Sequence, residues 1–207
     1  MNQSKENKKF IYLISPNKIK DENFYSNLAL VLSSGKVSFF QLRLKKETNQ
    51  SKLIIGKKIK KICKKYKVKF LINDDPLLAK KLNADGCHLG QKDMNLIKAR
   101  AILNNKIIGI TCHNSITLAK DAINAGADYL AFGAFYRTNT KKIKHYANKN
   151  ILSWSKKNVK IPVVAIGGIT NKNYSSLLDH GANYIAISSF IWKNKNILKA
   201  VKSFNKN

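Results

Sequence analysis

Short apolar runs rich in β-branched and aromatic residues recur along the whole chain, and longer segments with apolar residues at helical spacing separate them. Each run is too short for a helix and is bounded by turn residues, so each is predicted to be a strand. The expected strands are residues 10–14, 37–42, 68–72, 86–89, 107–111, 129–133, 163–166 and 184–187. The expected helices are residues 23–32, 53–66, 77–82, 96–103, 115–125, 151–157, 173–178 and 197–204.

Strict alternation of strand and helix is typical of βαβ units, which place their strands parallel in one sheet. Eight such units favour an α/β fold of the closed (β/α)8 TIM-barrel type, with a single domain over residues 1–207. A doubly wound open sheet is the alternative, because periodicity does not prove that the sheet closes. Two similar phrases, Gly126-Ala127-Asp128-Tyr129 and Gly181-Ala182-Asn183-Tyr184, fit the turns that lead from a helix into the next strand.

The composition supports a globular chain: 207 residues, 44% of them hydrophobic. No window of about 18 consecutive apolar residues could cross a bilayer, so a membrane protein is not expected. Three cysteines, Cys63, Cys87 and Cys112, form no C-x-x-C pair, which argues against a disulfide framework or a zinc site. The polar N-terminal segment shows no secretory signal, and we therefore expect a cytoplasmic protein.

The formal net charge of +28 raises the question of a nucleic-acid partner. Only three of the 39 basic residues are arginine, and the lysines are spread along the whole chain. Arginine binds phosphates and bases with two parallel hydrogen bonds, which lysine cannot make. A nucleic-acid-binding module would also present a clustered basic face. We expect solvated lysines, with no nucleic-acid or membrane partner.

In a barrel of this type, ligands bind at the C-terminal ends of the strands. The second strand ends in Gln41-Leu42-Arg43-Leu44-Lys45, where alternation places Gln41, Arg43 and Lys45 on one side. Two cations at the barrel mouth suit an anionic ligand. The alternative is that they are solvated, as other lysines of this chain are.

Acidic residues are scarce, yet several follow neighbouring strands. Asn73, Asp74 and Asp75 follow the third strand and Asp93 follows the fourth. Two carboxylates, completed by water and substrate phosphates, are typical of a magnesium site, and Asp74 with Asp93 fits this description. Asp75 stands before Pro76, where capping of the next helix is the favoured interpretation.

Hydroxyl and imidazole groups lie at or near the ends of the fourth and fifth strands. Thr111 could donate to a phosphate, and His113 could act as an acid or base or could be structural. His88 lies within an apolar strand and is interpreted as a packed residue or a hydrogen-bonding residue at the strand end. His145 and His180 are expected to be solvated.

The last three strands lead into segments that suit a phosphorylated ligand. After the sixth strand, Thr138 and Thr140 lie among cations in a loop that could clamp a phosphate. Gly167-Gly168 follows the seventh strand and Ser188-Ser189 the eighth, which is the recurrent phosphate site of such barrels.

The motifs QLRLK, IND, DGCHLGQKD, GITCH, DYLAFGAFYRTNTK and AIGGI occur in this order between Tyr12 and Ser189. In this set and order, the chain resembles the thiamine phosphate synthase/TenI superfamily. The resemblance implies a TIM barrel that joins 4-amino-2-methyl-5-pyrimidinylmethyl diphosphate to 4-methyl-5-(2-phosphooxyethyl)thiazole, or to its 2-carboxy form. The products implied are thiamine phosphate and diphosphate, and the implied cofactor is Mg²⁺.

The resemblance also implies residue roles. Substrate contacts are implied for Gln41, Arg43, Lys45, Asn73, Thr111, Thr138, Thr140, Lys141, Gly168, Ser188 and Ser189. Among these, Arg43, Lys45 and Lys141 would be catalytic through their contact with the diphosphate. Asp74 and Asp93 would be the metal ligands. Thr111 stands where the family usually has Ser, so the hydroxyl is kept.

Two departures from the family pattern occur at Asp75, where a basic residue is frequent, and at residues 134–137, which replace a proline-containing stretch. Two related functions remain open. A thiazole tautomerase of the TenI type would depend on His113 and need no metal, and a non-catalytic relative would only bind thiazole phosphate. Retention of Asp74, Asp93 and Arg43 together with Lys141 favours the synthase. The sequence leaves a homo-oligomer open.

Overall fold

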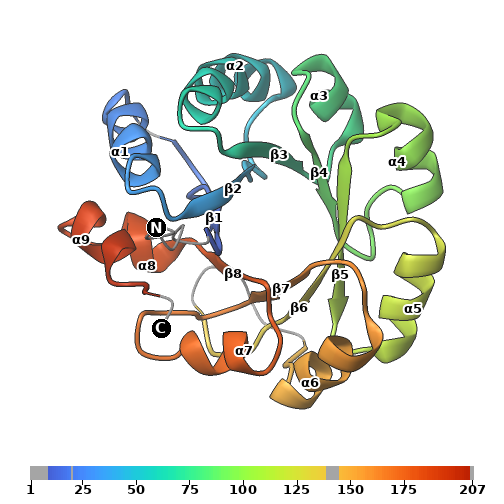
Figure 1. Ribbon diagram of the computed structural model, residues 1–207. Helices are drawn as coiled ribbons and strands as arrows, with labels where there is room; N and C mark the ends of the chain where they lie inside the picture. Colours follow the sequence, from blue (N-terminus) through green and yellow to red (C-terminus); the bar gives the residue numbers. More distant parts are fainter. Residues whose placement is uncertain (1–8, 20, 139–144, 206–207) are drawn as a thin grey trace, which may run out of the picture.

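The computed structural model describes residues 9–19, 21–138 and 145–205, and its eight parallel strands close into a barrel in sequence order. Each strand pairs with the next, and β8 (Tyr184–Ile187) pairs with β1 (Ile11–Ile14). Figure 1 looks along the barrel and shows the helices as a ring outside it. The predicted TIM barrel is confirmed, and the open sheet is excluded. No helix within the described residues is long and apolar enough to cross a bilayer.

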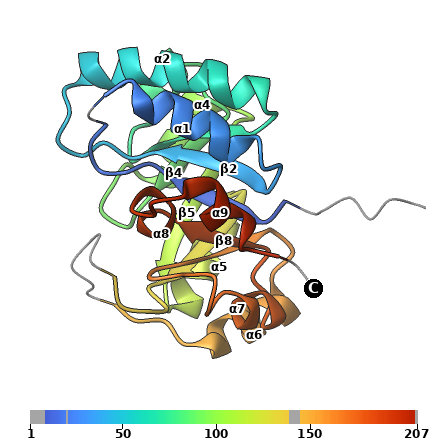
Figure 2. The same ribbon diagram turned by 90° about the vertical axis from the view of Figure 1, so that its left-hand side faces the viewer.

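The elements follow the predicted order. The other strands are β2 (Val37–Leu42), β3 (Lys69–Asn73), β4 (Gly86–Leu89), β5 (Ile107–His113), β6 (Tyr129–Gly133) and β7 (Val163–Ile166). The helices are α1 (Asn23–Leu32), α2 (Asn49–Lys65), α3 (Pro76–Lys81), α4 (Leu96–Leu103), α5 (Ile116–Asn124), α6 (Lys149–Asn158), α7 (Ser175–Asp179), α8 (Ser189–Trp192) and α9 (Ile197–Lys202). Seen from the side, α1 and α2 lie opposite α6 and α7 (Figure 2).

Two helices differ from the expectation by more than two residues. α2 begins four residues before the predicted residue 53, because the Thr48 side chain accepts a hydrogen bond from the Ser51 amide at 3.1 Å and caps the helix there. α8 was not expected, since its four residues are too few to show a helical period.

The strands are buried on both faces, and this explains why their sequences are almost continuously apolar. One face of each strand packs against the surrounding helices in the larger core, which includes Phe70 and Leu28. The alternate residues point into the barrel and form a separate inner cluster. The members of that inner cluster include two buried tyrosines, Tyr12 and Tyr129, and the partly buried Phe39 and Tyr184.

Reciprocal hydrogen bonds join three pairs of strands at their N-terminal ends, and we call these pairs the N-terminal clamps. In each clamp, the residue just before an even-numbered strand donates its backbone N–H to a residue near the start of the preceding strand. The side-chain oxygen of the residue before the even-numbered strand, in turn, accepts a hydrogen bond from the backbone N–H of the residue in the preceding strand. The clamps are Asp85 with Phe70 (2.8 and 2.8 Å), Asp128 with Ile108 (2.8 and 2.7 Å) and Asn183 with Val163 (2.8 and 2.8 Å).

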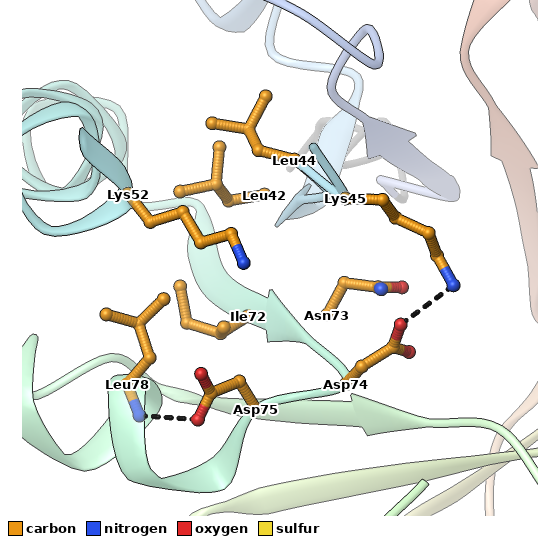
Figure 3. Close-up of a pocket in the computed structure, with 9 residues that line it drawn as sticks. All are labelled: Leu42, Leu44, Lys45, Lys52, Ile72, Asn73, Asp74, Asp75 and Leu78. Atoms are coloured by element: carbon orange, nitrogen blue, oxygen red, sulfur yellow. Dashed lines mark hydrogen bonds and ion pairs between the residues drawn. The ribbon is translucent and has the colours of Figure 1, made fainter. Parts of the chain in front are cut away.

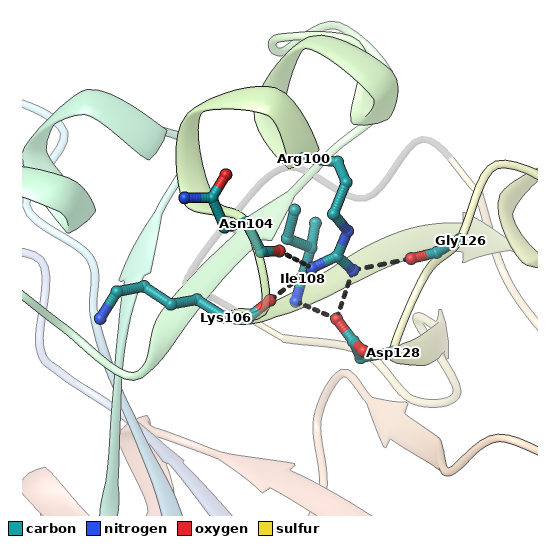
Figure 4. Close-up of polar contacts among 6 residues, drawn as sticks. All are labelled: Arg100, Asn104, Lys106, Ile108, Gly126 and Asp128. Carbon is teal, nitrogen blue, oxygen red and sulfur yellow. Dashed lines mark hydrogen bonds and ion pairs between the residues drawn. The ribbon is translucent and has the colours of Figure 1, made fainter.

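Arg100 of α4 reinforces the second clamp (Figure 4). Its Nη1 atom donates to the carbonyl oxygens of Asn104 and Lys106 at 2.7 and 2.6 Å. Its Nη2 atom donates to the Gly126 carbonyl at 2.7 Å and to Asp128 Oδ2 at 2.6 Å. One guanidinium group therefore satisfies three backbone carbonyls and one carboxylate, and it ties α4 to the turn that precedes β6.

Replacing Asp128 by alanine should lower the free energy of unfolding by about 2 kcal/mol, because the Ile108 amide and the Arg100 guanidinium both lose a charged acceptor. In a chain of this size, that loss corresponds to a thermal midpoint lower by roughly 4–8 °C. Asp121→Ala on the exposed side of α5 is the matched control and should change stability by less than about 0.5 kcal/mol. Equal midpoints for the two variants would contradict the role of the clamp.

Candidate active site

Polar side chains from β2, β3 and β4 meet at the C-terminal mouth of the barrel. Lys45, beyond the end of β2, places its Nζ atom 3.0 Å from Asp74 Oδ2, beyond the end of β3 (Figure 3). The Asp74 backbone amide donates to the His88 carbonyl at 2.8 Å, and the residue adopts a φ of +64°. This left-handed conformation turns the chain at the strand end, which brings the carboxylate beside the lysine.

The carboxyl groups of Asp74 and Asp93 are neighbours, and each influences the pKa of the other. Burial acts to raise the pKa of Asp74, but hydrogen bonds with Asp93 and Lys45 outweigh it and lower that pKa overall. Burial and the neighbouring Asp74 carboxylate raise the pKa of Asp93, even though its Oδ2 atom accepts a hydrogen bond from the Gly90 amide at 2.7 Å. Two carboxylates this close need a shared proton or a cation between them.

The donor set of this pair fits Mg²⁺. Within the described ranges, no three His, Cys, Asp or Glu side chains come together as a metal cage. A site with two carboxylates leaves its remaining positions to water and phosphate oxygens, which is how Mg²⁺ is usually bound beside a phosphorylated substrate. The predicted pair, Asp74 and Asp93, is thus brought together, while Mg²⁺ binding itself stays a prediction.

Arg43 lies beside the same centre. Its Nη1 atom donates to Asn17 Oδ1 at 2.6 Å, and its amide donates to the Ser15 hydroxyl at 2.9 Å. Burial lowers the pKa of Arg43, and the nearby Asp74 carboxylate opposes that shift. An arginine remains protonated under these conditions. Arg43 and Lys45 therefore bring two positive charges to the mouth, as the sequence predicts.

A pocket of about 320 Å³ adjoins this centre. Its apolar wall consists of Leu78 of α3 and of side chains at or just beyond the ends of β2 and β3, namely Leu42, Leu44 and Ile72. Lys52 of α2 reaches into the pocket (Figure 3). Asn73, Asp74 and Lys45 form the edge that the pocket shares with the mouth. Asp75 also lines it, but its Oδ1 atom accepts the Leu78 amide at 2.9 Å, which confirms its predicted capping role.

Gln41 does not lie at the rim with Arg43 and Lys45. Its side chain points to the same inner side, but only 2% of its surface is exposed, and its Nε2 atom donates to the Tyr12 hydroxyl at 3.0 Å. The predicted alternation of β2 is thus confirmed, and the structure adds that Gln41 lies deeper than the two cations. Gln41 belongs to the floor of the mouth, because it lies within the strand and not beyond its end.

A continuous series of hydrogen bonds crosses this floor from β2 to β5, and we call it the floor chain. From Gln41 it passes to the Tyr12 hydroxyl, then to the Tyr129 hydroxyl at 2.8 Å. From there it passes to His88 Nδ1 at 2.8 Å, and from His88 Nε2 to Thr111 Oγ1 at 2.8 Å. Burial lowers the pKa of His88 to about 4, so its ring is neutral at pH 7.

Sequence reasoning missed Tyr12 and Tyr129 as members of the site. It interpreted His88 as a packed or hydrogen-bonding strand residue, which is confirmed, and placed Thr111 at the mouth without a protein partner. The available signal was the presence of hydroxyl groups at inward positions of otherwise apolar strands, where a buried hydroxyl needs a partner.

The loop after β6 packs on the end of β7. The amides of Phe135 and Tyr136 donate to the carbonyls of Ile166 and Gly167 at 3.1 and 3.0 Å. Gly168 has a φ of +62°, and a Cβ atom there would lie 2.3 Å from the Arg137 carbonyl oxygen. Glycine is therefore required at this position for close contact between the two loops.

The remaining predicted residues are placed as follows. The Ser188 hydroxyl donates to the Ser15 carbonyl at 3.2 Å, and Ser189 begins α8, which Trp192 anchors through a 2.7 Å bond from Nε1 to the Ile14 carbonyl. Thr138 is half-buried. Thr140 and Lys141 lie outside the described residues, so their predicted roles stay predictions.

The histidines differ from one another. His113 has a φ of +54°, and its ring centroid lies 4.4 Å from that of His145, which is exposed as expected. His180 was expected to be solvated, but it is only half-exposed, and its Nδ1 atom makes a 2.5 Å contact with the Ser176 carbonyl of the same helical turn.

A closed parallel barrel with a paired-carboxylate centre and two cations at its C-terminal mouth is characteristic of TIM-barrel enzymes that act on phosphorylated small molecules. The family model described as thiamine monophosphate synthase matches residues 11–191, and the chain belongs to this family.

Known proteins similar to the chain agree with this assignment. A thiamine-phosphate synthase of Pelagibacter ubique is 73% identical over 195 residues, which is 94% of each chain. A thiamine-phosphate synthase of Rhodospirillum centenum is 37% identical over 198 residues, 95% of this chain and 96% of the other. The structure of a thiamine phosphate pyrophosphorylase from Pyrococcus furiosus superposes with a TM-score of 0.85 at 30% identity, covering 96% of this chain and 94% of that one.

Proposed function

We propose that this chain is a thiamine phosphate synthase, a transferase of thiamine biosynthesis. It condenses 4-amino-2-methyl-5-pyrimidinylmethyl diphosphate with 4-methyl-5-(2-phosphooxyethyl)thiazole, or with the 2-carboxy form, and releases diphosphate. The observation that carries the proposal is the Asp74–Asp93 pair beside Lys45 at the mouth of the barrel. A diphosphate leaving group needs this combination of a metal-binding acid pair and adjacent cations.

In this reaction the bond between the pyrimidinylmethyl carbon and the diphosphate oxygen breaks, and its electron pair leaves with the diphosphate. The thiazole nitrogen supplies the electron pair for the new bond to that carbon. Arg43 and Lys45, with Lys141, bind the diphosphate and stabilise the negative charge that develops on it. Asn73 and Gln41 orient the pyrimidine, and Thr111 contacts the diphosphate.

Asp74 and Asp93 would hold Mg²⁺, which when bound would help to neutralise the charge of the diphosphate. Gly168, Ser188 and Ser189, with Thr138 and Thr140, bind the thiazole phosphate. Support for this placement comes from the ends of β7 and β8, which carry the recurrent phosphate site of such barrels. Holding both substrates in one mouth makes their reaction effectively unimolecular.

We further infer a reducing, cytoplasmic setting. Cys63, Cys87 and Cys112 are all free and buried. Burial raises the pKa of Cys112 to about 12, so this thiol stays protonated and unreactive.

The test combines purified protein with Mg²⁺ and both substrates and follows thiamine phosphate by mass spectrometry. We expect product only when both substrates are present, loss of product when EDTA removes the metal, and recovery when Mg²⁺ is restored in excess. Circular dichroism before each assay establishes that the protein is folded. Folded protein that binds thiazole phosphate and forms no thiamine phosphate would contradict the proposal, and NMR detection of thiazole isomerisation would then test the tautomerase alternative through His113.

A further inference from the structure

We propose that the floor chain fixes the hydrogen-bonding polarity of two substrate contacts. It holds Gln41 with its carbonyl oxygen Oε1 toward the pyrimidine, and Thr111 with its hydroxyl hydrogen toward the diphosphate. Tyr12, Tyr129 and His88 are then positioning residues, which act on the substrate only through Gln41 and Thr111. The inference rests on the proposed function, since it concerns the pyrimidine diphosphate of that reaction.

The polarity follows from counting hydrogens along the chain. Gln41 Nε2 can only donate, so the Tyr12 hydroxyl accepts. The single hydrogen of Tyr12 then has one remaining neighbour, the Tyr129 hydroxyl. Because both hydroxyls are buried, leaving that hydrogen without an acceptor would cost about 1–3 kcal/mol. Tyr12 therefore donates to Tyr129.

The same argument carries the polarity to β5. Tyr129 accepts from Tyr12, so its own hydrogen goes to His88 Nδ1. With Nδ1 as an acceptor, the neutral ring carries its hydrogen on Nε2, which donates to Thr111 Oγ1. The Thr111 hydroxyl oxygen thus accepts a hydrogen bond from His88, and its own hydrogen remains available to a ligand.

One other fully paired arrangement exists, and it reverses every bond. In that arrangement, Thr111 donates to His88, His88 donates to Tyr129, and Tyr129 donates to Tyr12. Tyr12 then donates to the Gln41 carbonyl oxygen, so that Gln41 turns its NH₂ group to the substrate. The substrate distinguishes the two. The 4-amino group of the pyrimidine is a donor and needs an acceptor at Gln41, whereas the diphosphate is an acceptor and needs a donor at Thr111. The polarity of the structure pairs Gln41 with the amino group and Thr111 with the diphosphate, and the reversed polarity pairs neither.

Packing around the chain makes the polarity persistent. The Tyr129 ring stacks on His88 with centroids 5.6 Å apart and planes 17° apart, and the Tyr12 ring stacks on Phe39 at 5.5 Å. Only 2% of Tyr12 and 3% of Tyr129 is exposed, so water cannot readily replace a lost hydroxyl. No fully buried side-chain polar atom of the described residues lacks a partner, so the open Oε1 atom of Gln41 keeps access to solvent.

The test compares the affinities for two pyrimidine diphosphates, measured by titration calorimetry with Mg²⁺ and without thiazole phosphate. One is the natural 4-amino compound, and the other is its 4-oxo analogue, which presents an acceptor in place of the donor. Wild-type protein should bind the amino compound at least about tenfold more tightly, since a site built around one hydrogen bond rejects the opposite partner. Tighter binding of the oxo analogue by the wild-type protein would overturn the assigned polarity without any variant.

Tyr12→Phe and Tyr129→Phe each remove one hydroxyl and keep the ring. Each frees the Gln41 amide to turn over, so the ratio of the two affinities should fall at least fivefold, while the KM for thiazole phosphate in the synthase assay stays within twofold. Tyr184→Phe is the matched control, because Tyr184 also belongs to the inner cluster and packs edge-on against Phe39 outside the floor chain. It should keep the wild-type ratio.

A wild-type ratio in either folded Phe variant, or an equal fall in Tyr184→Phe, would overturn the inference. Thermal midpoints identify folded variants, and the two tyrosines provide independent tests. Failure of the proposed function is distinguishable, because it would appear as wild-type protein that forms no thiamine phosphate.

Discussion

Asp93→Asn is expected to lower kcat/KM for thiamine phosphate formation on the order of 10³-fold, about 4 kcal/mol of transition-state stabilisation. Asn cannot supply the second negative charge of the carboxyl pair with Asp74, so the proposed Mg²⁺ site should lose affinity for the cation. The isosteric amide keeps an oxygen that can accept from the Gly90 amide, so the loop after β4 should keep its structure. The measurement is initial rate against Mg²⁺ concentration, with product detected by mass spectrometry.

Asp121→Asn provides the matched control, since it makes the same chemical change on the exposed surface of α5. It should leave both the rate and the Mg²⁺ requirement unchanged. If Asp93→Asn keeps more than a tenth of the wild-type rate with an unaltered Mg²⁺ dependence, the carboxyl pair is not the metal centre.

Gly109→Ala should lower the free energy of unfolding by about 3 kcal/mol or more, because the added methyl group would overpack the barrel interior. A Cβ atom at Gly109 would lie 1.8 Å from Cζ of Tyr129. The ring cannot move aside easily, because its hydroxyl is bonded to Tyr12 and His88 inside the closed barrel. Urea unfolding followed by circular dichroism measures the change.

A double-mutant cycle identifies the cause of this loss. Tyr129→Val makes room for the new methyl group, so combining it with Gly109→Ala should cost at least about 1 kcal/mol less than the sum of the two single changes. Strict additivity, or a loss below about 1 kcal/mol for Gly109→Ala alone, would show that the inner cluster is not tightly packed at this point.

The fold was predictable because each strand is buried on both faces. All eight strands were located from continuous apolar runs, within a residue or two of the observed ends. Closure of the barrel is a property of pairing between β1 and β8, which are far apart in the sequence, so it was inferred from the number of units and not from any local pattern. α8 was missed because one helical turn leaves no periodic signal.

The site was predictable where function depends on position along a strand. Asp74, Asp93, Arg43 and Lys45 were assigned to the mouth because each follows a strand end, and the structure places them there. The floor chain was not predictable in this way. Tyr12 and Tyr129 are 117 residues apart, and alternation reveals that both point inward without revealing that their hydroxyls meet.

The N-terminal clamps have a consequence for how such a chain can change over evolutionary time. Asp85, Asp128 and Asn183 stabilise the barrel at one end, whereas the acid pair and its cations lie at the other. Substitutions that alter ligand preference at the mouth therefore leave these stabilising contacts untouched. A lineage can exchange its mouth loops without first accumulating compensating changes elsewhere, and the barrel serves as a durable platform for new specificities.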